Sequence, residues 1–461
     1  MIIEQIYTGC LAQGAYYLES KGEAAIIDPL RDIDVYLEKA ERNGARIKYI
    51  FETHFHADFV SGHLDLAKKT GAKIVYGPLA TTKYEKYEAH DGEVFPLGDI
   101  SLKVLHTPGH TPESTTYLLL DETGRERAIF SGDTLFIGDV GRPDLAQNGT
   151  LTKEDLAGTL FDSLREKIMP LPDDVIVYPA HGAGSACGKK MSRETTDTLG
   201  NQKATNYALR ADMTREEFIA EVTEGILPPP QYFPKNARLN REGYGAVDRV
   251  MERGARALSP DAFEEVANRE GALIIDTRHQ DDFRRGFIPN SIFFGIDGGF
   301  APWVGTLVKD LDKPILLVAE PGREEEATKR LARVGYDNAL GYLEGGIESW
   351  RKAGRELDTI DSITAPDLLE RLDKNEASDL VLDVRKPTEF EAGHLDGALN
   401  TPLDYMSSQM EKLDREHDYL IHCRSGYRSM IFASILKSRG FDRVADVAGG
   451  WRALEEARAT S

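Results

Sequence analysis

Histidine and aspartate side chains follow four predicted strands, in a set that could bind a metal ion. A strand over residues 49–52 leads into the segment 53–62, which holds two histidines and one aspartate. A further histidine or aspartate follows each of three later apolar strands, the first over 102–105 and the last over 175–177. Loops at strand ends are where a rigid scaffold usually presents binding residues. The six side chains are His54, His56, Asp58, His110, Asp133 and His181.

Any one of these side chains could simply cap a turn. Four strand ends that all deliver histidine or aspartate, each with glycine or proline nearby, favour a metal site over that simpler explanation. Imidazole nitrogens and carboxylate oxygens are ligands for zinc and iron. The sequence therefore predicts a metal centre in the first half of the chain.

Phe59 is the informative residue of the segment 53–62. The order of His54, His56 and Asp58 resembles the His-x-His-x-Asp-His signature of the metallo-β-lactamase superfamily. Hydrolases of that superfamily use the final Asp-His pair for a second zinc, but here Phe59 replaces the last histidine, and a phenyl ring cannot bind a metal. We therefore expect one metal with open positions, which favours iron and oxygen over two-zinc hydrolysis.

Residues 1–250 resemble the persulfide dioxygenases, which are relatives of the glyoxalase II thioesterases. The resemblance implies a metallo-β-lactamase αββα sandwich and one Fe(II) per chain, held by His54, His110 and Asp133. Two histidines and one carboxylate leave positions for substrate and O2. The remaining members of the set would orient these ligands from the second shell. They are His56, Asp58 and His181.

Three residues are candidates for substrate contact, and each has a plain structural alternative. Arg142, in a segment 138–144 that also resembles the family, could stabilise an anionic sulfur product or form a surface salt bridge. Cys187 could receive a persulfide, with the two lysines after it favouring its thiolate, or it could pack under a glycine-rich loop. Tyr232 could line the cleft or belong to the core.

A cysteine near the end of the sequence has the surroundings of a nucleophile. Cys423 follows an apolar strand and begins a short loop that leads into a helix, with Arg424 and Arg428 beside it. Loop N–H groups, the helix N-terminus and both guanidinium groups favour thiolate over thiol. The same surroundings would stabilise a cysteine persulfide or a bound sulfite. Because of the two arginines, we do not expect a buried structural cysteine.

The second half of the chain contains an internal repeat. Asp276 and Arg278 recur as Asp383 and Arg385, and an apolar strand precedes each aspartate. Strands that alternate with helical patterns predict parallel sheets covered on both faces. Both copies resemble rhodanese sulfurtransferase domains. The expected organisation is α/β throughout, with a metal domain over 1–250, one rhodanese-like domain over 257–356 and a second over 362–461.

The first copy departs from the rhodanese pattern at its active-site loop. The segment 316–325 contains no cysteine and gains carboxylates instead of cations. Without a nucleophile this copy cannot transfer sulfur by the usual route. We expect an inactive domain that spaces or docks its neighbours and keeps its fold through Asp276 and Arg278.

Composition is typical of a large enzyme of the cytoplasm. The chain has 461 residues, 41% of them hydrophobic, and a net charge of −21 at pH 7, which argues against nucleic acid or an anionic membrane as a partner. No apolar run is long enough to span a bilayer, and no signal peptide is visible at the N-terminus. Three cysteines cannot form a disulfide framework, which fits a reducing compartment.

These features predict an iron-dependent oxidation of a low-molecular-weight persulfide by O2 to sulfite, coupled to rhodanese sulfur transfer through Cys423 that gives thiosulfate. The alternative is a glyoxalase II-type zinc thioester hydrolase with a fused sulfurtransferase, against which Phe59 argues. A third hypothesis is a persulfide carrier or sensor without catalytic activity. The identity of the thiol and the oligomeric state, a homo-oligomer included, are left open.

Overall fold

The computed structural model describes residues 1–147, 149–374 and 380–460, and the chain divides into two compact units. The first unit comprises residues 1–247 with 332–335, and the second comprises residues 248–331 with 336–461. Of the last predicted domain, residues 375–379 and 461 lie outside the described residues.

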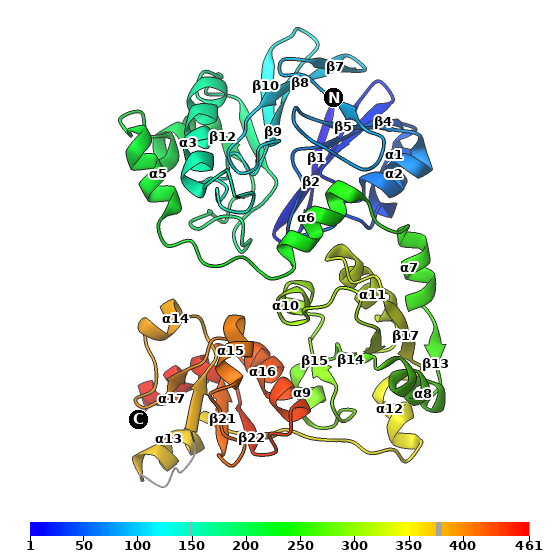
Figure 1. The fold of residues 1–461 in the computed structure, drawn as a ribbon, viewed down its shortest axis with the longest axis vertical. Helices are drawn as coiled ribbons and strands as arrows, with labels where there is room; N and C mark the ends of the chain where they lie inside the picture. Colours follow the sequence, from blue (N-terminus) through cyan, green and yellow to red (C-terminus); the bar gives the residue numbers. More distant parts are fainter. Residues whose placement is uncertain (148, 375–379, 461) are drawn as a thin grey trace. The chain divides into compact units, whose positions relative to one another are not determined.

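Two six-stranded sheets form the centre of the first unit (Figure 1), with strand orders β1-β2-β3-β4-β5-β6 and β12-β11-β10-β9-β8-β7. The strands of the first sheet are β1 (Ile2–Thr8), β2 (Gln13–Ser20), β3 (Glu23–Ile27), β4 (Arg46–Glu52), β5 (Lys73–Tyr76) and β6 (Tyr87–Glu88). Those of the second sheet are β7 (Val94–Leu97), β8 (Ile100–His106), β9 (Thr115–Leu120), β10 (Glu126–Gly132), β11 (Ile176–Pro179) and β12 (Asp197–Thr198).

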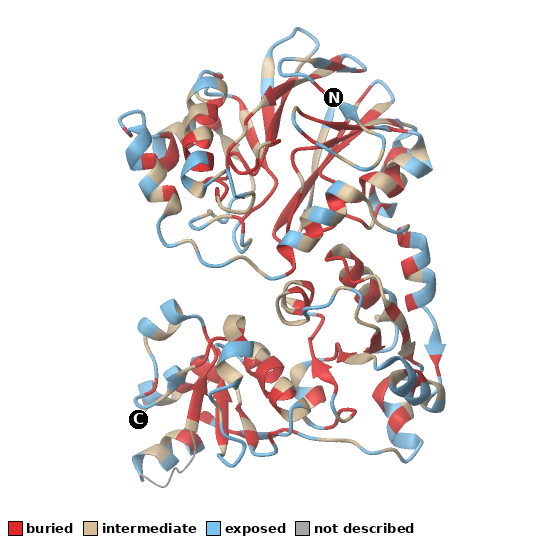
Figure 2. Cartoon of the chain, in the orientation of Figure 1, coloured by how far each residue is buried: buried red, intermediate tan, exposed pale blue. Residues whose placement is uncertain are grey.

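Alternation along the strands produces three stacked cores in this unit. Tyr16 and Leu18 of β2 face the second sheet, whereas Ala15 and Tyr17 face the helices behind the first sheet. This is the period-two pattern of a strand buried on both faces. A third core packs helices on the outer face of the second sheet. The predicted αββα sandwich is confirmed, and Figure 2 shows its buried strands between helices with exposed outer sides.

The helices of the first unit fall into two groups. Behind the first sheet lie α1 (Asp34–Asn43) and α2 (His63–Thr70). The second sheet is covered by α3 (Lys153–Ser163), η1 (Leu164–Ile168), α4 (Leu199–Thr205), η2 (Tyr207–Leu209) and α5 (Arg215–Thr223). Two further helices follow in the chain, α6 (Phe233–Glu242) and α7 (Val247–Gly254).

Two five-stranded parallel sheets of the same topology make up the second unit, which confirms the internal repeat. The first sheet has the order β13-β17-β16-β14-β15 and the second β18-β22-β21-β19-β20. The strands of the first copy are β13 (Ala257–Leu258), β14 (Leu273–Asp276), β15 (Ile292–Phe293), β16 (Ile315–Val318) and β17 (Ala339–Leu343). Those of the second copy are β18 (Asp361–Ile363), β19 (Leu380–Asp383), β20 (Leu399–Asn400), β21 (Tyr419–His422) and β22 (Val444–Val447).

Helices pack on these sheets in the same way in both copies. The helices of the first copy are α8 (Pro260–Glu270), α9 (Gln280–Arg284), α10 (Phe300–Leu307), α11 (Glu324–Arg333) and α12 (Gly346–Lys352). Those of the second copy are α13 (Ala365–Asp373), α14 (Pro387–Glu391), η3 (Leu403–Tyr405), α15 (Met406–Met410), α16 (Tyr427–Ser438) and α17 (Gly450–Thr460).

One buried ion pair is repeated almost atom for atom in the two copies. The Arg278 guanidinium donates to Oδ2 of Asp276 at 2.6 Å and to the carbonyl of Gly286 at 2.9 Å. In the second copy Arg385 donates to Asp383 at 2.6 Å and to a glycine carbonyl at 2.7 Å. Each pair joins the end of an interior strand, β14 or β19, to a loop, so the first copy keeps its fold as expected.

The two copies also contact each other through Tyr427, the first residue of α16. Its hydroxyl donates to the carbonyl of Gly295 in the first copy at 2.7 Å, and its ring packs edge-on against Phe293. Gly298 lies so close to this ring that a Cβ there would be 2.2 Å from it. Residues of the first copy therefore pack directly against the start of α16.

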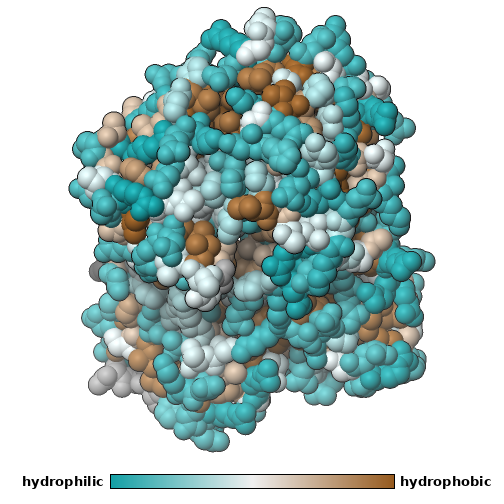
Figure 3. Space-filling model, turned by 45° about the horizontal axis from the view of Figure 1, so that its top comes forward, coloured by the Kyte–Doolittle hydropathy of each residue, from teal (hydrophilic) through white to brown (hydrophobic). Residues whose placement is uncertain are grey.

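The surface is consistent with the charged composition. The face drawn in Figure 3 is mostly hydrophilic, with hydrophobic side chains scattered between polar ones. Among the described residues, no helix is long and apolar enough to cross a membrane.

Replacement of Gly298 by alanine tests the contact between the first copy and Tyr427. The added methyl group would overlap the Tyr427 ring, so we expect Gly298→Ala to lower the stability of the second unit by about 1–3 kcal/mol. Gly245→Ala is the control, because a Cβ at Gly245 meets nothing within 4 Å. Thermal unfolding of both variants measures the effect, and equal melting temperatures would contradict the contact.

Candidate metal centre and sulfur-transfer site

Three buried side chains of the first unit direct their ligand atoms at one another. The Nε2 atoms of His110 and His54 lie 3.4 Å and 3.8 Å from Oδ2 of Asp133. Atoms bound at neighbouring positions of one ion, with bonds of about 2.1 Å, are separated by about 3 Å. Within the described part of the chain no hydrogen-bond donor reaches Asp133 Oδ2, although the atom is buried. The three residues thus fit a single metal ion.

Strand ends and backbone contacts hold these residues in place. His54 follows β4, His110 follows β8 and Asp133 follows β10. The Nδ1 atom of His110 lies 2.8 Å from the carbonyl oxygen of Arg142, so that nitrogen donates and Nε2 keeps its lone pair. Gly141 is needed nearby, because a Cβ there would be 2.1 Å from the carbonyl oxygen of Asp133.

A carboxylate that the sequence analysis did not single out orients His54. The Thr53 hydroxyl donates to Oδ2 of Asp28 at 2.8 Å and lies 3.0 Å from Nδ1 of His54, from which it can accept. Such contacts behind a ligand fix its tautomer and ring orientation. Asp28 follows β3 with a φ of 50°, an unusual conformation that no sequence pattern announces.

The protonation of Asp133 and His54 suits a cation. Burial opposes ionisation of Asp133, but its imidazole neighbours, first His181 and then His54 and His110, lower the pKa of its carboxyl. Burial, aided by His56, lowers the pKa of His54 well below its usual range. An ionised carboxylate and a neutral imidazole are the forms that bind metals.

His181 lies between two carboxylates. Its Nδ1 is 2.8 Å from Asp133 and its Nε2 is 2.8 Å from Asp58. Burial disfavours the charged ring, yet the two carboxylates raise the pKa of His181 well above its usual range. In this form His181 donates to Asp133 and orients it.

The ring of Phe59 packs beside the histidines of this site. Its side chain is fully buried, and its ring stacks on that of His56 with 4.3 Å between centroids. His56 in turn places Nε2 3.0 Å from Asp28. The structure therefore brings all six predicted residues into one buried region and puts an apolar ring among them.

Glu52 and His63 extend this cluster and were not predicted. Nδ1 of His63 lies 3.3 Å from Glu52, and both side chains are fully buried. Burial and the charge of Asp28 raise the pKa of Glu52, and burial lowers the pKa of His63 to about 3. An acidic residue at the end of the apolar strand β4 is the one sequence signal that could have indicated the cluster.

Arg142 has a structural task in this site. Its guanidinium donates to both oxygens of Asp144, at 2.6 and 2.8 Å, and to the carbonyls of Ala186 and Leu227. These four bonds use most of the donors of Arg142. Of the two alternatives, the salt bridge is therefore closer to what is observed, although Arg142 is buried and not at the surface. Contact of Arg142 with an anionic product stays a prediction.

Cys187 lies near the metal ligands, but its surroundings differ from those expected. Its sulfur, Asp133 and His181 offer ligand atoms within 4.8 Å of one another. The lysines expected to favour a thiolate point away, with Nζ of Lys189 on the Glu221 carbonyl and that of Lys190 on the Glu221 carboxylate. Burial, with nearby carboxylates, instead raises the pKa of the Cys187 thiol. That part of the expectation was wrong, because the side chains leave the loop in a direction its sequence does not reveal.

Tyr232 is buried at the start of α6, where its ring packs edge-on against Phe233. This arrangement agrees with core packing. A contact between Tyr232 and a substrate stays a prediction.

In the second unit, the side chain of Cys423 is buried under the loop that leads into α16. Its sulfur accepts the backbone N–H of Gly426 at 3.2 Å, and Gly426 has a φ of 102° that turns the chain into α16. The side chain is 1% exposed, so the expectation that the flanking arginines keep it out of the interior was wrong. Arg424 is exposed and Arg428 is half-buried against Glu389, while the sulfur lies at the N-terminal end of α16, where the helix dipole favours an anion.

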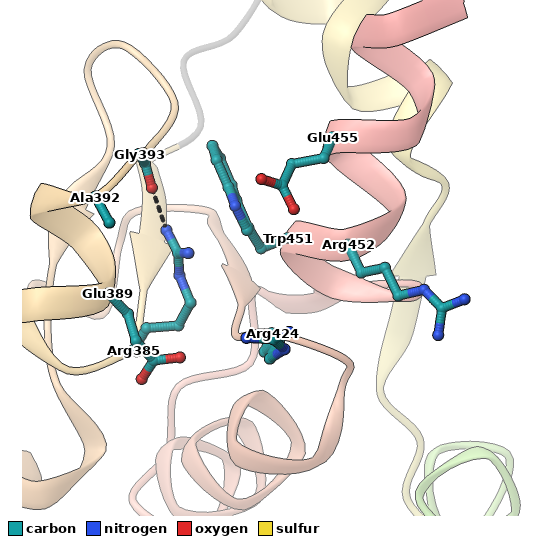
Figure 4. Close-up of a pocket in the computed structure, with 8 residues that line it drawn as sticks. All are labelled: Arg385, Glu389, Ala392, Gly393, Arg424, Trp451, Arg452 and Glu455. Atoms are coloured by element: carbon teal, nitrogen blue, oxygen red, sulfur yellow. Dashed lines mark hydrogen bonds between the residues drawn. The ribbon is translucent and has the colours of Figure 1, made fainter. Parts of the chain in front are cut away.

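The two arginines beside Cys423 have different roles. Arg428 donates to both oxygens of Glu389, at 2.7 and 2.8 Å, and this pair offsets part of the positive charge expected at the loop. Arg424 is exposed and lines a cavity of about 310 Å³ (Figure 4). The other residues that line it are Arg385, Glu389, Ala392, Gly393, Trp451, Arg452 and Glu455.

In the first copy the equivalent loop is built from ion pairs. Strand pairing puts Ala319 where the second copy has Cys423. Arg323 pairs with Asp297 at 2.8 Å and donates to Glu326 at 2.9 Å. Alanine in place of the cysteine and a loop that contains carboxylates agree with the expectation that this domain does not transfer sulfur.

Comparison with known proteins supports each part of this description. The family model of the metallo-beta-lactamase superfamily matches residues 8–181, and that of the rhodanese-like domain matches residues 259–353 and 364–457. Persulfide dioxygenase ETHE1, mitochondrial, of Bos taurus is 31% identical over 217 residues, which are 45% of this chain and 74% of that protein.

Two further comparisons concern the hydrolases and the fold. A hydroxyacylglutathione hydrolase of Polaromonas sp. is 33% identical over 187 residues, 39% of this chain and 66% of the relative. The crystal structure of a metallo-beta-lactamase from Staphylococcus aureus subsp. aureus COL is 33% identical with a TM-score of 0.65, covering 75% of this chain and 98% of that chain. The chain therefore belongs to the metallo-β-lactamase superfamily, as a homologue of persulfide dioxygenases in which two rhodanese-like domains follow the metallo-β-lactamase domain.

Proposed function

We propose that the metallo-β-lactamase domain oxidises a low-molecular-weight persulfide with one bound Fe(II), and that the second rhodanese domain transfers sulfane sulfur through Cys423. In the first reaction R–S–SH, O2 and water give R–SH, sulfite and two protons. In the second, sulfite takes the outer sulfur of a persulfide on Cys423 and leaves as thiosulfate, while Cys423 returns to the thiolate.

The observation that carries this proposal is the buried ring of Phe59 beside a complete set of three ligands. His54, His110 and Asp133 supply two imidazoles and one carboxylate, the set typical of iron sites that react with oxygen. A two-zinc site needs further ligands where Phe59 stands, and Asp58 and His181 are already engaged with each other at 2.8 Å. One metal fits the site better than two.

The surrounding residues prepare the site. His181 holds Asp133, the Arg142 carbonyl holds His110, and the Asp28–Thr53 pair holds His54. Their burial keeps water from competing for the ligands and strengthens the attraction for a cation. When bound, iron supplies the open coordination positions and the redox chemistry that a reaction with O2 needs.

The second site suits an anionic sulfur compound. The loop N–H of Gly426 already donates to the Cys423 sulfur, and a persulfide formed there would stay at the N-terminal end of α16. Arg424 stands in the cavity beside the loop without a carboxylate partner in the described chain (Figure 4), where it can attract sulfite or thiosulfate.

Removal of the anionic ligand should abolish both metal retention and activity. We expect Asp133→Ala to lose bound iron and to reduce oxygen uptake with glutathione persulfide by more than about 100-fold, since even residues behind a ligand alter metal affinity by about 10- to 100-fold. Metal analysis and an oxygen electrode measure both effects. Asp212→Ala, at an exposed aspartate, is the control. An active protein with two tightly bound metals per chain would refute the proposal and favour a zinc thioester hydrolase.

Restoring a ligand type at position 59 should change the metal count. Phe59→His places an imidazole beside His56 and His181, so we expect zinc bound per chain to rise, with no hydrolase activity required. Phe59→Leu is the matched control, because leucine opens similar space without a ligand. Equal zinc content in the two variants would show that position 59 does not present a ligand.

The two active sites should be separable. We expect Cys423→Ser to lose sulfur transfer from thiosulfate, because an alcohol does not form the persulfide at neutral pH, while oxygen uptake with a supplied persulfide continues. Sulfite should replace thiosulfate among the products. Cys10→Ser is the control and should keep both activities. Loss of oxygen uptake in Cys423→Ser, with iron content unchanged, would mean that Cys423 delivers substrate to the metal.

A further inference from the structure

A short chain of polar groups lies behind Cys423, and sulfur transfer as described above does not use it. The hydroxyl of Ser429, in the first turns of α16, lies 3.6 Å from the Cys423 sulfur. The same hydroxyl donates to Oδ1 of Asp446 at 2.6 Å. All three side chains are buried, so the path from thiol to carboxyl runs through the interior of the domain.

Asp446 is an unusual residue for its place. It lies on β22, beside the central strand of a parallel sheet, and its side chain is 4% exposed. A carboxyl group is expensive to bury without an ion pair. The charged groups that face it are Arg284 and Asp281 of α9, which have opposite signs. Burial raises the pKa of Asp446 to about 7, although Ser429 and Arg284 act against this.

The first copy shows that the fold does not need this carboxyl. In the second copy Ile421 of β21 pairs with Asp446, and in the first copy the equivalent Leu317 of β16 pairs with Tyr342. Tyrosine therefore stands in the position of Asp446 in the copy that has alanine in place of the cysteine. The carboxyl and the nucleophile occur together, and the sheet forms without either.

We propose that Ser429 and Asp446 form a proton relay for Cys423, an inference that rests on the proposed sulfur transfer at that residue. The thiol proton passes to the Ser429 oxygen as the hydroxyl proton passes to Oδ1 of Asp446. One S–H bond breaks, one O–H bond forms on the carboxyl, and the net charge of the three groups does not change. The thiolate is then free to attack a sulfane sulfur.

The surroundings of the two ends suit such an exchange. A base works best when its pKa is near that of its partner, and a carboxyl near 7 is closer to an ordinary thiol, at about 8.5, than a solvated one at about 4. The Gly426 N–H, the N-terminus of α16 and the nearby Arg428 stabilise the anion at the sulfur. The negative charge thus moves from the buried carboxylate of Asp446 to the Cys423 sulfur, where it is better stabilised.

The pH dependence of Cys423 alkylation tests the relay directly. Iodoacetamide reacts with thiolates, so the rate of modification of the Cys423 peptide, followed by mass spectrometry from pH 5 to 10, reports the thiolate fraction. We expect Asp446→Asn and Ser429→Ala each to lower the rate at pH 7 by about tenfold and to move the midpoint up by about one pH unit. An unchanged profile in either variant overturns the proposal.

Further variants separate a relay from simple packing. Because the two residues act in series, Asp446→Asn combined with Ser429→Ala should be no slower than either single variant, whereas independent contacts would give multiplied losses. Ser438→Ala on the same helix and Asp442→Asn on the surface are the controls and should keep the wild-type profile. Burial of the charged Asp446 carboxyl is unfavourable above pH 7, so Asp446→Asn should unfold at a higher temperature than wild type in that range. A variant that is folded and yet is alkylated slowly at Cys423 therefore identifies the relay.

The alkylation assay needs no sulfur substrate, which separates this proposal from the proposed function. If the wild-type protein transfers no sulfur but the variants still shift the profile, the relay stands and the assigned reaction fails. If the wild type transfers sulfur and the profiles coincide, the relay alone fails.

Discussion

The buried carboxylate of Asp133 is the constraint on which the first domain depends. A charge in such surroundings needs compensation, and three imidazole rings supply part of it. His181 takes one oxygen of Asp133, and the other faces His54 and His110 with no donor in the described chain. A bound cation would satisfy that second oxygen. The loops after β4, β8 and β10 are thus arranged around a charge that the protein alone leaves incompletely paired.

The second unit also has a buried site suited to an anion, in this case at the Cys423 sulfur. A backbone N–H and a helix N-terminus, instead of a metal, would stabilise a thiolate or persulfide at Cys423, and Arg428 is held near by Glu389. Both sites are buried, and both depend on groups behind the reacting atom: Asp28 and His181 in one, Ser429 and Asp446 in the other.

Much of this arrangement could be predicted, for a physical reason. Histidine, aspartate and cysteine at strand ends are local features, and parallel or mixed sheets bring strand ends together. The family resemblance of the motifs implied the αββα sandwich, and the internal repeat, with Asp276 and Arg278 as residues that tie loops together, could be recognised in the sequence. Asp28, the Arg428–Glu389 pair and the burial of Cys423 could not, because each depends on which distant segment packs against it. The direction in which Lys189 leaves its loop is likewise fixed only by tertiary contacts.

The contact of Tyr427 with Gly295 and Gly298 changes how mutations in the first rhodanese-like copy should be interpreted. A domain without a nucleophile would be expected to tolerate substitutions, yet these glycines lie against Tyr427 at the start of α16, and a Cβ at Gly298 would be 2.2 Å from its ring. A substitution in the first copy can therefore disturb the start of α16, directly after the loop that holds Cys423. Removal of the first copy would expose the ring of Tyr427 and take away the Phe293 N–H that donates to Ser434, so the second copy relies on the first for part of its packing.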